Sequence, residues 1–158
     1  MKKILGLALV GLVLVCGMGS AQAGSLPVKL SIIPTVGLPL GETVHGLDIG
    51  LIGTKIDEVK GLQGAWIFAG TKQKMVGLQG AFVSINSNEM TGIQYSFYNK
   101  SANLTGLQLG FINSAENMTG IQFGFVNIAN KAHGLQLGLV NIIKEGRLPF
   151  MVFINGDF

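Results

Sequence analysis

The sequence has few charged residues, few prolines and one cysteine. Only 12% of its 158 residues are charged, against ~25% in an average soluble protein. Four prolines and no glycine at every third position exclude a collagen-like chain. The 48% hydrophobic content is too high for an intrinsically disordered chain. A single cysteine allows no disulfide within the chain, so a domain of this length must hold together by packing and hydrogen bonds.

The first 23 residues have the pattern of a secretory signal peptide. Two lysines precede an apolar run from Ile4 to Gly19, and Ala21 and Ala23 occupy the small-x-small positions of a cleavage site. The run is short for a membrane-spanning helix, which needs ~20 apolar residues. Cleavage after Ala23 would remove the cysteine and leave residues 24–158, with nine basic and eight acidic residues. We therefore expect an exported protein without the basic field that nucleic-acid binding requires.

The remainder is dominated by one unit that occurs seven times. The steps between units are 15, 16, 15, 14, 14 and 14 residues, as counted from the repeat glycines Gly46, Gly61, Gly77, Gly92, Gly106, Gly120 and Gly134. The clearest units read GLQLGFINSAENMT (106–119) and GIQFGFVNIANKAH (120–133). Apolar and polar residues alternate with period two in the first half of each unit, which predicts a strand. The polar tails, such as 114–119, carry turn-forming residues and predict a corner or loop.

Equivalent positions of the units carry the same kinds of side chain. The third position is Asp48 and then Gln63, Gln79, Gln94, Gln108, Gln122 and Gln136. The sixth is Leu51, Trp66, Phe82, Phe97, Phe111, Phe125 and Leu139. Asn99, Asn113, Asn127 and Asn141 form a further column, which we expect Asn86 to join. Like residues stack at ~4.8 Å in parallel, in-register strands, where amides can bond to amides and rings to rings.

These columns predict an all-β, single-domain β-solenoid of about seven coils of 14–16 residues, spanning residues 46–143. We expect the aromatic column to be buried, Asp48 to cap the glutamine ladder, and the second glycine of each unit, such as Gly110 or Gly124, to adopt positive φ at a bend. Residues 24–45 are expected to form an N-terminal edge strand or cap, and residues 144–158 a C-terminal cap.

A small antiparallel outer-membrane β-barrel, acting as a membrane anchor or a small pore, is the alternative fold and function. The chain ends in the aromatic Phe158, and Leu/Phe alternating with Gln/Gly would suit a lipid-facing and a lumen-facing side. The predicted strands of about eight residues are shorter than the ~9–11 residues such barrels use. Identical columns also suit parallel stacking better than strands that reverse direction.

The runs PVKLSIIPTV and RLPFMVFINGDF, together with the GLQLGFIN-type units between them, resemble bacterial surface repeat-containing proteins. That resemblance implies export to a cell surface or outer membrane, and no enzymatic activity comes with it. The spacing of Gln108, Gly110, Asn113 and Ala115 is also similar to the curlin repeat, although these units are shorter and more apolar. The second resemblance implies a fibre subunit as an alternative.

No enzyme motif stands out in the sequence. His45 and His133 are isolated from each other, and Asp57 and Glu58 lie in a charged tail where a solvated corner is expected. We therefore predict no catalytic, metal or cofactor-binding residues. The sequence favours an exported, non-enzymatic structural or interaction protein that presents a rigid repeat scaffold. The outer membrane, another surface protein and a second copy of the chain all remain open as partners.

Overall fold

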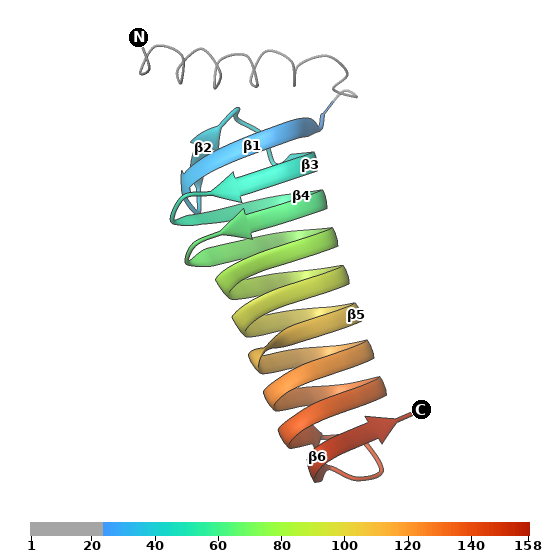
Figure 1. Cartoon of the computed structure of the whole chain (residues 1–158). Helices are drawn as coiled ribbons and strands as arrows, with labels where there is room; N and C mark the ends of the chain where they lie inside the picture. Colours follow the sequence, from blue (N-terminus) through green and yellow to red (C-terminus); the bar gives the residue numbers. More distant parts are fainter. Residues whose placement is uncertain (1–23) are drawn as a thin grey trace.

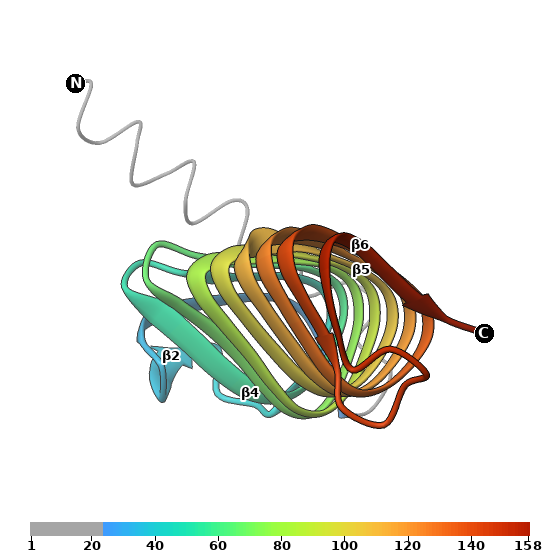
Figure 2. The ribbon, with the colours of Figure 1, turned by 90° about the horizontal axis from the view of Figure 1, so that it is seen from below.

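The computed structural model describes residues 24–158, and the predicted signal peptide (1–23) lies outside the described residues. The chain is all-β and forms a β-solenoid whose coils stack along one axis into a rod (Figure 1). Its strands are β1 (Leu26–Ile33), β2 (Val36–Leu38), β3 (Thr43–Gly50), β4 (Gly53–Ala65), β5 (Phe68–Ile143) and β6 (Phe150–Asp157). Seen from below, the coils overlie one another as a flattened oval (Figure 2).

Successive coils are parallel and in register. β3 pairs with β4 so that Asp48 lies beside Gln63, and β4 pairs with β5 so that Gln63 lies beside Gln79. The long β5 winds through several coils as one strand. This arrangement confirms the predicted β-solenoid. The antiparallel barrel alternative is wrong, because neighbouring coils run in the same direction.

The tails of the repeats are strands, not the loops that their polar composition predicted. In the tail 114–119, Ala115 and Met118 are buried while Glu116 and Asn117 are exposed. The equivalents of Met118 in five other coils are buried in the same hydrophobic cluster, which also contains Ile56, Ala115 and Ala129. These five equivalents are Val44, Val59, Met75, Met90 and Leu104. Each tail is therefore the second wall of a flattened coil, and its inward residues contribute the hydrophobic burial that stabilises the stack.

The first glycine of each unit, and not the second, has the special backbone conformation. All seven repeat glycines have φ between 126° and 146°. A Cβ on any of them would overlap a backbone carbonyl oxygen of the preceding coil. Gly110 and Gly124, where we expected positive φ, keep φ values that other residues adopt. Gly110 and Gly124 must lack a side chain for a different reason. A Cβ at either position would overlap a backbone carbonyl oxygen of the preceding coil and the side-chain amide of a buried asparagine.

An antiparallel strand is added at each end of the rod. β2 pairs antiparallel with β1, which itself pairs parallel with β3. At the other end β6 pairs antiparallel with the last coil of β5, with Gln136 beside Asn155. A strand of reversed direction does not repeat the ladder pattern of the coil beneath it, so both additions end the parallel stack.

Candidate functional site

The glutamine column is a continuous hydrogen-bonded ladder through the core. Gln136 Nε2 donates to Gln122 Oε1 at 2.7 Å, and Gln122 Nε2 donates to Gln108 Oε1 at 2.8 Å. The same bond recurs from Gln108 to Gln94 at 2.8 Å and from Gln94 to Gln79 at 3.1 Å. These side chains are fully or almost fully buried. A buried amide is costly unless it is hydrogen-bonded. Stacking solves this because each amide donates to one neighbour and accepts from the other.

The ladder ends on a carboxylate. Gln79 donates to Gln63, and Gln63 Nε2 donates to Asp48 Oδ2 at 2.9 Å. Thr54 Oγ1 donates to the same carboxylate at 2.8 Å. Asp48 therefore accepts the last hydrogen bond of the ladder. A glutamine or asparagine at this position would also bring N–H donors, which would need further acceptors in the core. Burial raises the pKa of Asp48 above its ordinary value, and the hydrogen bonds from Gln63 and Thr54 and the charge of Lys29 oppose that rise.

The raised pKa of Asp48 predicts a measurable pH dependence of stability. Since the folded chain holds the Asp48 proton more tightly than the unfolded chain does, it binds more protons between the two pKa values. Wild-type stability must therefore fall relative to Asp48→Asn as pH rises above about 4, the ordinary aspartate pKa. Urea unfolding of both proteins across this pH range measures the difference. A difference independent of pH would contradict the buried, desolvated carboxylate.

The asparagine column is a second ladder whose bonds run in the opposite direction. Asn99 donates to Asn113 at 2.9 Å, Asn113 to Asn127 at 2.8 Å, and Asn127 to Asn141 at 2.9 Å. All four are completely buried. The glutamine amides donate towards the N-terminal coils and the asparagine amides towards the C-terminal coils. The dipoles of the two ladders therefore oppose each other within one narrow core.

Asn86 does not join the asparagine ladder as we expected. Its Nδ2 donates to Gln79 Oε1 at 2.8 Å, and its Oδ1 accepts from Thr71. Ser84, two residues earlier, faces the core next to Ser96. Counted from the repeat glycines, Ser84 occupies the position of Asn99, and Asn86 occupies the position of Ser101. Asn86 therefore contacts the glutamine of its own coil, as Ser101 does by donating to Gln94 at 3.0 Å.

The aromatic column stacks as predicted by its spacing but on the outside of the rod. Phe82, Phe97, Phe111 and Phe125 are parallel, with ring centroids 5.0, 5.0 and 4.9 Å apart. They are exposed by 44–56%, so the expectation that they are buried is wrong. Trp66 is 84% exposed and its ring makes no such stack. The inward positions between these residues, such as Gly110, are already crowded by backbone and asparagine amides, which leaves no room for inward rings.

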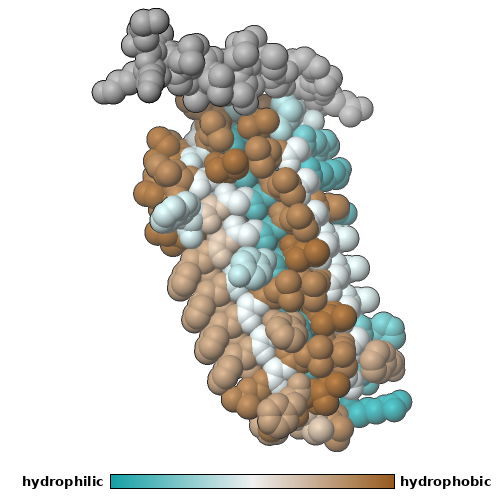
Figure 3. Space-filling view, viewed as in Figure 1, coloured by the Kyte–Doolittle hydropathy of each residue, from teal (hydrophilic) through white to brown (hydrophobic). Residues whose placement is uncertain are grey.

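One face of the rod is therefore apolar on its outer surface (Figure 3). A groove of about 850 Å³ runs along it between two rows of side chains. One row is the phenylalanine stack, and Tyr95, Leu109 and Phe123 form the other. Ser96, Gly110 and Gly124 lie between the rows. The period-two alternation in the sequence predicts that each strand has two different sides. It does not predict which of the two sides lies on the outer surface.

Charged residues gather in a different part of the coil. In the outward column of the tails, Lys74 pairs with Glu89 at 2.9 Å and Lys131 with Glu145 at 3.4 Å, while Asn117 donates to Asn103 at 2.9 Å. These groups are largely exposed. Pairs of this kind contribute little to stability, so their main effect is to keep this surface polar.

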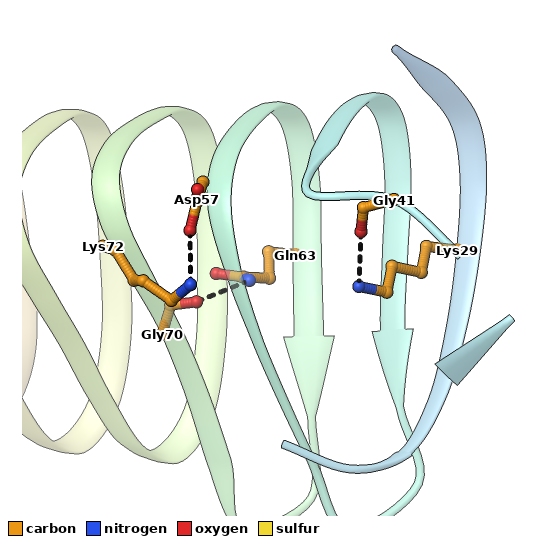
Figure 4. A network of polar contacts seen from close by, with 6 residues as sticks. All are labelled: Lys29, Gly41, Asp57, Gln63, Gly70 and Lys72. Atoms are coloured by element: carbon orange, nitrogen blue, oxygen red, sulfur yellow. Dashed lines mark hydrogen bonds and ion pairs between the residues drawn. The ribbon is translucent and has the colours of Figure 1, made fainter. Parts of the chain in front are cut away.

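A small polar cluster lies near the N-terminal coils (Figure 4). Lys72 Nζ is 2.6 Å from Asp57 Oδ1, and this contact lowers the pKa of Asp57. Gln63 Nε2 also donates to the Gly70 carbonyl at 3.2 Å, and Lys29 Nζ donates to the Gly41 carbonyl at 3.0 Å. Asp57 thus has Lys72 as its ion-pair partner.

Within residues 24–158, no group of three or more His, Cys, Asp and Glu side chains is placed to hold a metal ion. His133 makes an edge contact with Phe158, with ring centroids 6.3 Å apart. None of the described segments forms a helix of the length and apolarity needed to cross a membrane.

The chain matches no protein-family model, no curated protein and no solved structure.

Proposed function

We propose that the protein is an exported, non-enzymatic structural or interaction module of a bacterial cell surface, with the rod as its scaffold. The observation that carries the proposal is the combination of a hydrogen-bonded polar core with an apolar outer face. The amide ladders fix the coils in one register, and the aromatic and aliphatic residues that would stabilise a core are displayed outside it. An exposed apolar patch of this extent is characteristic of an interaction surface.

The antiparallel end strands favour a discrete rod over the curlin-like fibre subunit. Continuation of the same parallel ladder needs an end coil that presents a free parallel edge. Here β6 runs antiparallel along the last coil, and β2 runs antiparallel along residues 30–33 of β1. A thioflavin-positive fibre that grows end to end from the wild-type chain would favour the fibre alternative.

Export is the part of the proposal that rests on residues 1–23. Expression of the full coding sequence in a bacterial host, followed by cell fractionation and intact-mass measurement, tests it. We expect protein outside the cytoplasm that begins at Gly24. Ala21→Arg should block processing and retain the full mass, because signal peptidase requires a small residue there. Full-length protein confined to the cytoplasm in both cases would contradict export.

A further inference from the structure

The apolar face carries rows of side chains with a fixed spacing of about 5 Å along the rod. A partner that fits such rows over several coils must repeat at the same interval. Another solenoid of the same rise meets this condition, and the chain itself is such a solenoid. We propose that two copies of this chain pack face to face through this surface. This inference rests on the proposed interaction role of the face and names its partner.

The exposed area is sufficient for a stable dimer. Six aromatic side chains contribute to the face: Phe82, Tyr95, Phe97, Phe111, Phe123 and Phe125. Their exposed fractions, between 44% and 68%, together equal about three whole aromatic side chains, or about 600 Å² at ~200 Å² each. A standard interface buries ~800 Å² per partner. Exposed aliphatic residues near the same rows, such as Leu62, Leu78 and Leu139, supply the difference.

The row beside the phenylalanine stack is complementary to itself when reversed. Its members in successive coils are Ile49, Gly64, Gly80, Tyr95, Leu109, Phe123 and Leu137. A hollow of about 410 Å³ lies beside Gly80 and is lined by Leu62, Leu78, Ile93 and Tyr95. A twofold axis parallel to the strands, passing through the coil of Tyr95, would place Phe123 of one copy over Gly64 of the other. Leu109 would likewise meet Gly80.

The same axis fits the aromatic column. Phe97 lies in the coil of Tyr95, with Phe82 and Phe111 one coil away on either side and Trp66 and Phe125 two coils away. Reversal therefore places aromatic residues over aromatic residues. A twofold contact closes after two copies, so the assembly is a dimer of antiparallel rods and not a filament.

The charge distribution favours this partner over a lipid surface. No residue that lines the groove is charged, so the groove offers nothing to an anionic headgroup. The ion pairs Lys74–Glu89 and Lys131–Glu145 belong to the tails, outside the proposed contact. Apolar area with no charged group at its centre is typical of the core of protein–protein interfaces.

The molar mass in solution is the first test. The wild-type chain, purified from whichever cell fraction holds it, should sediment as a dimer over a broad concentration range. Phe111→Asp should weaken dimerisation about 100-fold or more, because the carboxylate would be buried without a partner in the contact. It should leave the monomer folded, since Phe111 points outward. Phe123→Asp should act in the same way and serves as the second variant if the first fails to fold. Glu116→Lys, in the tail of the same coil as Phe111, is the matched control and should remain dimeric.

Disulfide formation tests the position of the axis. In a chain carrying Cys16→Ser, Tyr95→Cys should give a covalent dimer on mild oxidation, because this residue meets its own copy at the axis. Asn117→Cys, exposed on the polar side, should not. A wild-type monomer at all concentrations would overturn the proposal. So would folded Phe111→Asp or Phe123→Asp variants that dimerise normally, equal cross-linking at both sites, or monomers that bind phosphatidylcholine vesicles through this face. Export is measured separately by fractionation, so its failure would leave the dimer result interpretable.

Discussion

Replacing Gly106 by alanine should destabilise the protein by about 3 kcal/mol or more. Gly106 has φ of 130°, where an L-residue is strained by ~1–3 kcal/mol. Its new Cβ would also overlap the carbonyl oxygen of Gly92, so neighbouring coils would have to separate. Thermal or urea unfolding of the variant measures the loss.

Gly80→Ala is the matched control for this substitution. Gly80 also lies in a repeat, but its φ is ordinary and an added Cβ would lie 3.5 Å from the Tyr95 carbonyl oxygen, which is normal contact. We expect its stability to change by no more than about 1 kcal/mol, since alanine also reduces the entropy of the unfolded chain. Equal effects at Gly106 and Gly80 would contradict the close approach of successive repeat glycines.

Gln108→Glu should cost about 3–5 kcal/mol at neutral pH, because it buries a charge without a partner. The introduced carboxylate can accept from Gln122 but cannot donate to Gln94, whose Oε1 would face a second acceptor. Its pKa would be raised by burial. The loss should therefore shrink as pH falls towards about 4, the ordinary glutamate pKa, because the folded chain then takes up the proton.

Asn117→Asp makes the same amide-to-carboxylate change on the outer surface. Asn117 donates to Asn103 there but is exposed, so water can solvate the new charge. We expect a change within about 0.5 kcal/mol and little dependence on pH. Denaturant unfolding of both variants at neutral and acidic pH compares them. A Gln108→Glu protein as stable as Asn117→Asp at neutral pH would show that the glutamine column is not a buried ladder.

The register of the solenoid could be predicted because it depends only on spacing. Residues that recur at 14–16 positions, such as Gln94, Gln108 and Gln122, stack whichever way they point. The inside and outside of the coil could not be assigned by hydrophobicity. Leucine and phenylalanine are usually buried and glutamine usually exposed. In the first half of each unit the order is reversed, because a stacked amide satisfies its neighbours and loses the usual penalty of burial. The tails keep the usual order, since Leu104 and Met118 are buried.

Two of the errors had signals in the sequence. The first position of the unit is glycine in all seven repeats, whereas the fifth also admits Ala65, Ala81 and Ser96. Only the first position therefore requires a residue without a side chain. The tails likewise contain an apolar residue two positions before every repeat glycine, such as Leu104 and Met118. A regular apolar position of this kind is better explained by an inward-facing strand than by a loop.

The central claim is that like amides lie directly above one another in parallel coils. Nuclear Overhauser effects between the side-chain amide protons of assigned glutamines test it most directly. We predict contacts from Gln94 to Gln108, from Gln108 to Gln122 and from Gln122 to Gln136, so that contacting residues differ by a constant 14 in number. Contacts whose residue numbers instead have a constant sum would mean antiparallel neighbours and would contradict the account.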